Sequence, residues 1–479
     1  MDTKKLRQKI LDLAIRGKLV PQDPNDEPAS VLLERIKAEK ERLIKEGKIK
    51  RSKKSAKTSD TPHYPYLLPK GWEWSKLETF INKATDFVAS GSFASLRENV
   101  KYYDEPKYAV LVRTKDFQSN FTKDLVYTDK QGYEFLSNSN LFGGELILPN
   151  IGASIGKVFI VPNLQERMTL APNSIMIRCY KDTHKEWLQY LFLSPFGQEQ
   201  LRIISSSTAQ GKFNKTDLRT LNIPIPPLAE QERIVTEIKR WFTLIDEIEQ
   251  SKFDLQNIIS QTKSKILDLA IHGKLVPQNP NDEPAIELLK RITPDFTPCD
   301  NGHYTQLPEG WSICKLSKLC KIENGFAFSS NDYKSEGTPL IRISNIVNNS
   351  IDLTDCVYIQ NNAEYRFVVN KGDLLIAMSG ATTGKMGVYS FERTAFLNQR
   401  VGNIKILDGS LLSADYRNVY MQSKVDDILK FAYGGAQPNI SASVIGDFDI
   451  LLPPLEEQKR IVCTVNKVFT KLDTIMESL

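Results

Sequence analysis

One block of sequence occurs twice in this chain. Residues 10–29 read ILDLAIRGKLVPQDPNDEPA, and residues 266–285, displaced by 256 positions, read ILDLAIHGKLVPQNPNDEPA. The copies differ only where Arg16 becomes His272 and Asp23 becomes Asn279. A near-identical block that returns after so long an interval indicates a duplicated domain, because solenoid repeats have periods of only about 20 to 50 residues.

Two shorter motifs follow the same duplication. LPKGW at 68–72 matches LPEGW at 307–311, and IPIPPLAEQERIV at 223–235 matches ILLPPLEEQKRIV at 450–462. The displacement falls from 256 to 239 and then to 227 positions, so the second copy has lost residues between the motifs. The second copy ends almost where the equivalent of the N-terminus would begin. We therefore expect two halves related by a pseudo-two-fold axis, like a homodimer joined into one chain.

Apolar residues recur with heptad spacing in the segments that join the copies. The central segment carries them at Ile234, Ile238, Trp241, Ile245, Ile248, Leu255, Ile259, Ile266 and Leu269. The C-terminal segment carries them at Ile461, Val465, Val468, Leu472 and Ile475, and the N-terminal segment at Leu6, Ile10 and Leu13. This spacing is typical of a helical seam. It predicts a central helix over 228–271, roughly 65 Å long at about 1.5 Å per residue.

The partner of this helix follows from the cyclic order of the copies. We expect an antiparallel, composite partner built from residues 455–479 and 3–15. The alternative is that each helix packs only on its own domain. Gly17 and Gly273 should end the helices in the left-handed conformation. A second short helix should follow at 29–36 and again at 285–292.

The regions at about 61–222 and 303–449 differ in kind from these helices. They contain short apolar runs bounded by Gly, Asn, Asp and Ser, which are typical of strands. The two regions diverge in sequence, except that GASIGKV at 152–158 corresponds to GATTGKMGV at 380–388. A constant scaffold around divergent modules is the pattern expected when two modules bind different targets.

With these motifs in this order, the chain resembles the specificity subunits of type I restriction-modification systems. The resemblance covers nearly the whole chain and rests on the duplicated LPxGW, GxxxGK, PPLxEQxRIV and ILDLAIxGKLVPQ motifs. It implies that each variable region is a target recognition domain for one half of a bipartite DNA sequence. The conserved helices then form an antiparallel spacer on which two modification subunits dock.

The predicted fold class is α+β: two pseudo-two-fold-related mixed, mostly β target recognition domains separated by a long antiparallel two-helix coiled coil. Residues 1–60 form an N-terminal conserved helical segment with a basic linker, and 61–227 the first recognition domain. Residues 228–302 form the central helix and the repeat of the N-terminal segment. Residues 303–454 form the second recognition domain, and 455–479 the C-terminal conserved helix.

The resemblance also implies a non-catalytic role in the cytoplasm. The expected partners are double-stranded DNA, two modification (methyltransferase) subunits and, through the complex, the restriction subunits, with no membrane. No cofactor is expected on this chain; S-adenosylmethionine, ATP and Mg²⁺ belong to other subunits. Two alternatives remain: a single-chain restriction or modification enzyme, and a coiled-coil scaffold that does not read DNA.

Catalytic and metal-binding motifs are weak in this sequence. GASIGK and GATTGK have three residues between the glycines and lack a Ser or Thr after the Lys, so a strand-turn-strand is favoured over a phosphate loop. The amino-methyltransferase motif, Asn or Asp before two prolines and an aromatic residue, is absent. The four histidines are scattered, and the six cysteines lack paired spacing. Glu230, Glu232, Glu456 and Glu457 lie in predicted first helical turns, where the helix dipole accounts for them.

Polar residues in the glycine-containing loops are the candidates for DNA contact, since Asn, Gln, Arg, Ser and Thr suit base edges and Lys suits phosphates. Turn formation is the alternative for each of them, and Lys157 and Lys385 could equally be solvent-facing hairpin lysines. The candidates are Ser154, Lys157, Asn173, Gln210, Lys212, Asn214, Lys215, Thr382, Thr383, Lys385, Asn398, Gln399, Arg400, Gln437 and Asn439.

Charge and hydropathy limit the remaining possibilities. A net charge of +5 is only mildly basic and does not by itself indicate a nucleic-acid partner. No apolar stretch is long enough for a membrane span, which needs roughly 20 residues. The basic run at 37–57 has no counterpart in the second copy. We interpret it as a solvated helix followed by a linker, with weak DNA or partner contact as the alternative.

Overall fold

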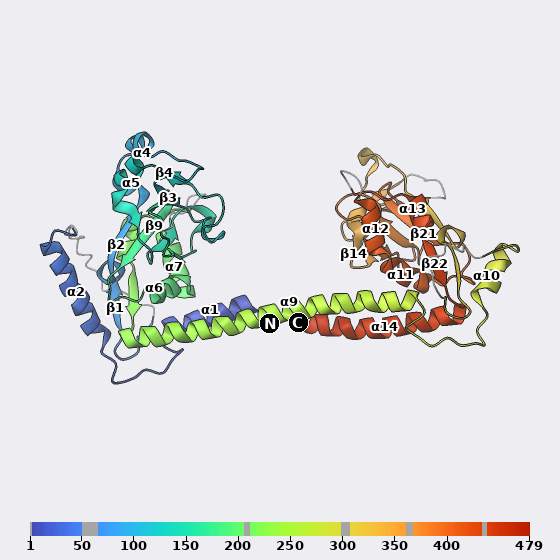
Figure 1. The fold of residues 1–479 in the computed structure, drawn as a ribbon, viewed down its shortest axis with the longest axis horizontal. Helices are drawn as coiled ribbons and strands as arrows, with labels where there is room; N and C mark the ends of the chain where they lie inside the picture. Colours follow the sequence, from blue (N-terminus) through green and yellow to red (C-terminus); the bar gives the residue numbers. More distant parts are fainter. Residues whose placement is uncertain (1, 50–65, 206–210, 298–306, 361–366, 434–437) are drawn as a thin grey trace. The chain divides into compact units, whose positions relative to one another are not determined.

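The computed structural model describes residues 2–49, 66–205, 211–297, 307–360, 367–433 and 438–479 (Figure 1). The chain forms two compact units, Met1–Ser251 and Lys252–Leu479, and the helix α9 (Leu228–Ile271) contributes residues to both. Each unit combines helices with β-sheets, so the predicted α+β class is confirmed. Within the described ranges, no helix is at once long and apolar enough to span a membrane.

The first unit contains, in its described part, the sheets β2-β9-β6-β7, β4-β3-β8-β5 and β1-β10. Its helices before α9 are α1 (Thr3–Ile15), α2 (Ala29–Lys45), α3 (Leu77–Phe80), α4 (Phe93–Asn99), α5 (Lys130–Phe135), α6 (Lys185–Leu193), α7 (Pro195–Ile204) and α8 (Lys215–Thr220). Its strands are β1 (Glu73–Lys76), β2 (Ile81–Asp86), β3 (Ala109–Val112), β4 (Tyr127–Thr128), β5 (Asn140–Leu141), β6 (Leu146–Pro149), β7 (Phe159–Ile160), β8 (Met168–Leu170), β9 (Ser174–Cys179) and β10 (Asn222–Ile225). Short 3-10 helices include η1 (Phe87–Ser90) and η3 (Gly152–Ser154).

The second unit contains, in its described part, the sheets β12-β21-β18-β19-β15-β14, β16-β13-β20-β17 and β11-β22. Its helices after α9 are α10 (Ala285–Ile292), α11 (Ala414–Ser423), α12 (Val425–Ala432), α13 (Ala442–Gly446) and α14 (Leu455–Ser478). Its strands are β11 (Ser312–Lys315), β12 (Cys320–Asn324), β13 (Thr338–Ile341), β14 (Ile346–Val347), β15 (Ser350–Ile351), β16 (Val357–Ile359), β17 (Val368–Val369), β18 (Leu374–Ala377), β19 (Met386–Val388), β20 (Ala395–Leu397), β21 (Val401–Ile406) and β22 (Asp449–Leu452).

The two units share one strand topology although their sequences diverge. The order β2-β9-β6-β7 corresponds to β12-β21-β18-β19, and β4-β3-β8-β5 corresponds to β16-β13-β20-β17. The parallel pair β3 with β8 is also matched by the parallel pair β13 with β20. The second unit adds the β14–β15 hairpin. The duplication predicted from the scaffold motifs therefore extends through the divergent regions.

The GxxxGK segments connect antiparallel strands in both units. β6 pairs with β7, and β18 pairs with β19. β6 and β18 are buried along their whole length, which is why their sequences, LILP and LLIA, are continuously apolar. The predicted strand-turn-strand is confirmed.

In the first unit, α1 runs antiparallel to the first part of α9. The guanidinium of Arg7 pairs with Asp246 at 2.6 Å, whereas Gln22, beyond the end of α1, donates to Glu230 at 3.1 Å. The chain therefore runs along α1 in the direction opposite to that along α9. The apolar side chains buried in this region include Ile10, Leu11, Ala14, Ile15, Ile234, Ile238 and Ile245.

In the second unit, α14 runs antiparallel to the last part of α9. The ammonium of Lys263 pairs with Asp473 near the end of α14. Gln278, beyond the end of α9, donates to Glu457 at the beginning of α14 at 3.1 Å. Ile461 and Val465 of α14 are buried in the same core as Leu267 and Ala270 of α9.

The predicted apolar seam is wrong at four positions. Trp241, Ile248 and Leu255 of α9 are 38%, 45% and 36% exposed, and Ile475 of α14 is 43% exposed. By contrast Ile238, Ile245 and Ile259, which recur at multiples of seven, are at most 3% exposed. In a regular two-stranded coiled coil both rows of the heptad face the partner helix, so the packing along α9 and α14 departs from that regular pattern at these four positions.

The glycines that follow α1 and α9 lie in contact with the LPxGW motifs. Gly17 and Gly273 have φ of 63° and 65°, in the left-handed region, as predicted. A Cβ on Gly17 would lie 2.4 Å from Cγ of Pro69, and one on Gly273 would lie 2.3 Å from Cγ of Pro308. Since no side chain fits there, these two motifs are physically linked in each copy.

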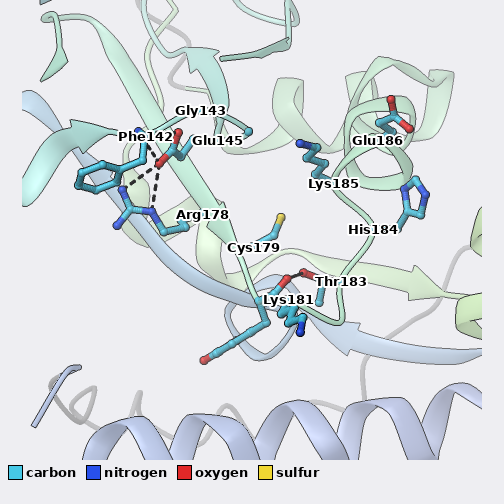
Figure 2. A pocket seen from close by; sticks show the side chains of 12 residues that line it. Phe142, Gly143, Glu145, Arg178, Cys179, Lys181, Thr183, His184, Lys185 and Glu186 are labelled. Carbon is cyan, nitrogen blue, oxygen red and sulfur yellow. Dashed lines mark hydrogen bonds and ion pairs between the residues drawn. The ribbon is translucent and has the colours of Figure 1, made fainter. Parts of the chain in front are cut away.

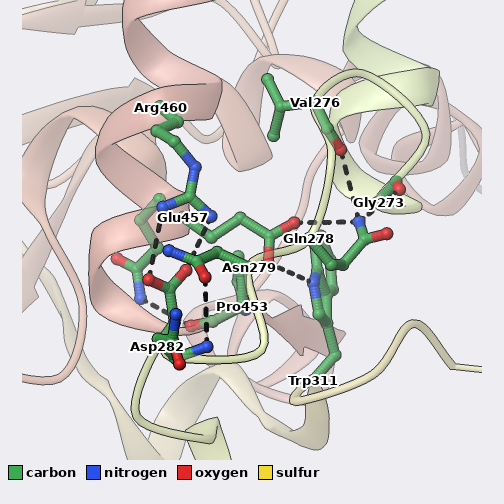
Figure 3. Close-up of polar contacts among 11 residues, drawn as sticks. Gly273, Val276, Gln278, Asn279, Asp282, Trp311, Pro453, Glu457 and Arg460 are labelled. Carbon is green, nitrogen blue, oxygen red and sulfur yellow. Dashed lines mark hydrogen bonds and ion pairs between the residues drawn. The ribbon is translucent and has the colours of Figure 1, made fainter.

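A buried carboxylate connects the other duplicated motifs (Figure 3). In the second unit, the carboxylate of Glu457 accepts hydrogen bonds from Nε2 of Gln278 at 3.1 Å and Nε1 of Trp311 at 3.0 Å. Beside it, Arg460 pairs with Asp282 at 2.6 Å. Glu457 and Arg460 belong to the PPLxEQxR motif and Gln278 to KLVPQ. Trp311 belongs to LPxGW and Asp282 to PNDEPA.

The first unit repeats this cluster with the same residue types. Glu230 accepts from Gln22 at 3.1 Å and from Trp72 at 2.9 Å, and Arg233 pairs with Asp26 at 2.6 Å. The helix dipole is therefore not a sufficient explanation for Glu230 and Glu457, which are both buried. Burial raises the pKa of each carboxyl group, and the donors partly offset that rise.

Candidate nucleic-acid interface

Three loops of the first unit meet at the end of strand β6. The N–H of Asn150 donates to the carbonyl of Asn173 at 3.2 Å, and the N–H of Phe213 donates to the carbonyl of Asn150 at 3.2 Å. The N–H of Gly152 donates to the carbonyl of Gly211 at 3.0 Å. Backbone hydrogen bonds thus hold the GxxxGK loop, residue 173 and residues 211–213 together. Of the predicted DNA-contacting residues, Ser154, Asn173 and Lys212 belong to this junction.

The second unit builds the same junction from different residues. The N–H of Met378 donates to the carbonyl of Arg400 at 2.9 Å, and the N–H of Ile440 donates to the carbonyl of Met378 at 2.9 Å. The N–H of Gly380 donates to the carbonyl of Pro438 at 3.0 Å. Met378 therefore takes the place of Asn150, Arg400 that of Asn173, and Asn439 that of Lys212. We call these two equivalent sites the loop junctions.

A cavity of about 630 Å³ opens at the loop junction of the first unit. Its apolar wall comes from the segment 87–102, where Phe93 and Tyr102 are 75% and 55% exposed. Its polar wall includes Arg97, Asn173 and Lys212. None of these three side chains makes a hydrogen bond or ion pair with another described residue. Exposed apolar surface beside unengaged donors is suited to the edges of base pairs, which offer hydrogen-bond acceptors and thymine methyl groups.

Asn173 has a backbone conformation that presents its side chain at this cavity. Its φ of 67° lies in the left-handed region, which Asn tolerates better than most residues. The residue follows the exposed Pro172 and precedes the buried strand β9, which fixes its position.

Several other predicted contact residues are engaged within the chain. The side chain of Asn214 caps α8, accepting from the N–H groups of Thr216 at 2.8 Å and Asp217 at 3.0 Å. Lys215 pairs with Asp86 at 2.7 Å. The hydroxyl of Thr383 is buried and donates to the carbonyl of Gly380 at 2.7 Å. The geometry gives each of these residues a structural role. A contact with DNA would be a second role for the same side chain.

The remaining candidates lie on or near the loop junctions. Ser154 and Thr382 are partly exposed, and Thr382 has a buried hydroxyl oxygen without a described partner. Asn398 is partly exposed and bridges to Phe326. Gln210 and Gln437 lie outside the described residues. The exposed ones are Lys157, Lys385, Gln399, Arg400 and Asn439.

Sequence reasoning missed the contribution of the segment 87–102. Phe93, Arg97 and Tyr102 line the cavity, yet they belong to no duplicated motif. The signal that could have found them is the alternation of aromatic and basic residues in FASLRENVKYY, which is typical of nucleic-acid surfaces.

Comparison with known proteins identifies the family. The model for the type I restriction modification DNA specificity domain matches residues 69–255 and 308–479. The chain belongs to this family of DNA specificity subunits. It is 30% identical to the type I restriction enzyme EcoAI specificity subunit of Escherichia coli, over 97% of this chain and 88% of the relative. It is 27% identical to the EcoEI specificity subunit of the same organism, over 99% and 90%.

Solved structures show the same fold. One, described in terms of complex assembly and conformational transition of the type I R-M system, has a TM-score of 0.58 at 19% identity, covering 86% of this chain and 94% of that one. The HsdS subunit from Thermoanaerobacter tengcongensis has a TM-score of 0.52 at 19% identity, covering 86% and 93%. The predicted family, and the role as a specificity component rather than the enzyme itself, are confirmed.

A second cavity of this specificity subunit carries side chains that enzymes use (Figure 2). It has a volume of about 710 Å³, and its lining includes Glu145, Cys179 and His184. Glu145 is buried and pairs with Arg178 at 3.0 Å. Burial raises the pKa of the Cys179 thiol to about 11, so it is protonated at neutral pH.

The histidine of this cavity has a structural role. Nδ1 of His184 accepts from the N–H of Trp187 at 3.4 Å and so caps α6, and burial lowers the pKa of its imidazole. The arrangement provides neither a reactive thiolate nor a free carboxylate. Across the described ranges, no group of three or more His, Cys, Asp or Glu residues is positioned to hold a metal ion.

Proposed function

We propose that this specificity subunit reads a bipartite, non-palindromic sequence in double-stranded DNA, one half with each recognition domain. We assign the first domain to residues 61–227 and the second to 303–454. The observation that carries the proposal is the repeated loop junction. The same backbone framework presents Asn173 and Lys212 in one unit and Arg400 and Asn439 in the other. Different side chains on equivalent frameworks are suited to different base sequences.

Within each junction we assign two kinds of contact. Asn173, Gln399, Arg400 and Asn439 have amide or guanidinium groups that can form paired hydrogen bonds with base edges in the major groove. Lys157, Lys212 and Lys385 are exposed and suited to phosphates, which fix the register without reading sequence. Phe93 and Tyr102 add apolar surface for contact with bases or with thymine methyl groups.

We further propose that α9 and its antiparallel partners act as a coiled-coil spacer between the domains. The contacts of Arg7 with Asp246 and of Lys263 with Asp473 support this role, because they fix an antiparallel neighbour along each part of α9. Two domains that contact the same face of a duplex should have half-sites about one helical turn apart, roughly 10 to 10.5 base pairs between centres.

We also propose partners and cofactors, which the resemblance to the family implies. Two modification subunits should dock on the conserved helices, and the restriction subunits should join through the resulting methyltransferase. S-adenosylmethionine, ATP and Mg²⁺ should be bound by those subunits, and the complex should act in the cytoplasm. The chain itself supplies the choice of DNA sequence.

The test is a genome-wide map of methylated adenines in the host with and without this gene. The expected result is loss of methylation at one asymmetric, bipartite motif when the gene is deleted. An unchanged map would contradict the proposal and favour a scaffold without DNA reading. Methyl transfer or DNA cleavage by the purified chain alone would instead favour the single-chain enzyme.

A further inference from the structure

A third cavity of the first unit, about 490 Å³ in volume, is lined by an excess of basic side chains. Lys40 and Lys48 come from α2 and the residues after it, Lys83 from β2, and Arg219 from α8. Glu78 is the one carboxylate among the described lining residues. The cavity is therefore suited to an anion.

Most of these cations have some local partner, but none of those partners neutralises the cavity. Lys40 donates to the backbone carbonyl of Glu78 at 3.2 Å, and Arg219 donates to the carbonyl of Ala84. Lys48 pairs at 2.8 Å with Glu46, which does not line the cavity. Carbonyl groups accept hydrogen bonds without cancelling a charge.

Lys83 is the least compensated of the four. Its side chain makes no hydrogen bond or ion pair with another described residue. Its pKa is lowered by partial burial and by the nearby charges of Arg178 and Arg219. Arg178, opposite Lys83 in the β2–β9 register, has its own carboxylate partner in Glu145 at 3.0 Å. An anion in the cavity would relieve the repulsion between Lys83 and Arg219.

Two elements lead from this cavity to the loop junction. β2 contributes Lys83 and Ala84 here and Asp86 to the 630 Å³ cavity. α8 contributes Arg219 here, and its cap Asn214 lines the other cavity. Three strand residues span about 10 Å, which corresponds to about three base pairs at 3.4 Å each. A duplex at the loop junction would thus reach this site within a few base pairs.

The described part of the second copy has no equivalent set of uncompensated charges. In the strand registers the position of Lys83 is occupied by Lys321, since Lys83 lies opposite Arg178 and Lys321 lies opposite the equivalent Lys405. Glu323 pairs with both of these lysines, at 2.7 and 3.1 Å, and so compensates their charges. The position of Arg219 is occupied by Gly446, at a displacement of 227 residues. Helix α10 ends at Ile292, whereas its counterpart α2 extends to Lys45 and carries Lys40. Among the described residues, this uncompensated basic cavity is therefore a feature of the first domain.

We propose that this cavity binds a backbone phosphate of DNA that flanks the half-site of the first recognition domain. The inference rests on the proposed reading of DNA by that domain. It makes the complex asymmetric, because only one side of the target has this additional anchor. Continuity with the loop junction favours DNA over an acidic protein segment as the occupant.

The experiment uses the complete methyltransferase complex and fluorescent duplexes that contain its target. One duplex has long flanks, and two others are truncated close to one half-site or the other. The variants are Lys83→Ala combined with Arg219→Ala, and Lys48→Ala, an exposed change that leaves the core intact. Lys130→Ala on α5, where the side chain is 68% exposed, is the matched control.

Binding to the long duplex should weaken for the double variant, with the preference for target over scrambled DNA unchanged. The slope of log affinity against log salt should become shallower by about 0.9 for each phosphate that the variant no longer neutralises. The difference from wild type should vanish on the duplex truncated beside the first domain's half-site. Lys48→Ala should show a smaller change of the same kind, and Lys130→Ala none.

Two outcomes would overturn the inference. One is a wild-type salt slope in the double variant. The other is impaired assembly with modification subunits while the assembled complex binds DNA normally, which would assign the cavity to an acidic protein surface. Failure of the proposed function is distinguishable, since the wild-type complex would then not discriminate target from scrambled DNA.

Discussion

Trp311 donates its indole N–H to the buried carboxylate of Glu457 at 3.0 Å, and Trp72 repeats this contact with Glu230 at 2.9 Å. Each tryptophan ends an LPxGW motif, and each glutamate lies in the first turn of a conserved helix. The contact joins the base of a recognition domain to the helix that follows it. A buried carboxylate is tolerated only with such donors, which explains why the motifs recur as a set.

The first prediction concerns the pH dependence of this contact. Burial raises the pKa of Glu457 in the folded state above its value in the unfolded chain. The folded state therefore binds the proton more tightly than the unfolded chain. The resulting stabilisation of the folded state is fully present below about pH 4.5 and is lost as pH rises through the folded pKa. The free energy of unfolding of the wild type, minus that of Glu457→Gln, should fall as pH rises from 4 to 8.

Urea unfolding at a series of pH values measures this difference. Each unit of separation between the folded and unfolded pKa is worth about 1.4 kcal/mol. Glu456→Gln is the matched control, because Glu456 is adjacent but its side chain is 60% exposed. If this difference in unfolding free energy were as independent of pH for Glu457→Gln as for Glu456→Gln, the account would be contradicted.

The second prediction concerns the helix contact in the first unit. Ile245→Asp places a carboxylate in the buried row of α9 and should lower the free energy of unfolding by about 3 kcal/mol or more. Ile248→Asp, three residues away on the same helix, should change it by less than about 1 kcal/mol because Ile248 is 45% exposed. Urea denaturation followed by circular dichroism makes the comparison. Equal losses would show that the buried row is not the structural seam.

Sequence alone predicted the scaffold well, and the reason is physical. The span of α9, predicted as 228–271, is observed as Leu228–Ile271 because proline precedes it and a left-handed glycine follows it. The exposed Trp241 and Ile248 could not be foreseen, since a heptad pattern does not reveal how many partners a helix has. The pairing that joins Asn173 to Asn150 was also hidden, because it depends on strands far apart in sequence.

The third prediction concerns base reading by Asn173. Asn173→Gly keeps the left-handed backbone and removes only the side chain. If the amide pairs with a base edge, affinity for the target should fall by about 1 to 3 kcal/mol and specificity should relax at one position of the first half-site. Binding to a library of single-base target variants measures both effects.

The control for Asn173 lies in the same unit. Asn120→Gly changes another left-handed asparagine, with φ of 47°, in an exposed position. It should leave the base preference unchanged. If Asn173→Gly behaved like Asn120→Gly, Asn173 would have a purely conformational role.

The fourth prediction concerns the spacer. Inserting one heptad at the same level in α9 and in its C-terminal partner should lengthen the separation between recognition domains by about 10 Å, at roughly 1.5 Å per residue. This corresponds to about three base pairs at 3.4 Å each. The methylated motif should therefore acquire a longer non-specific spacer with unchanged half-sequences, although activity should fall because the domains also rotate about the duplex. Methylation of sites with the original spacing would show that the helices do not set the distance.

The central claim is that each recognition domain reads one half of the target, and an exchange of one domain tests it most directly. Residues 61–222 would be replaced by the equivalent region of another specificity subunit of this family, leaving the helices and the second domain unchanged. Genome-wide mapping of methylated adenines should then reveal a hybrid motif, with one half-sequence replaced and the other retained. A change in both half-sequences, or in neither, would contradict the account.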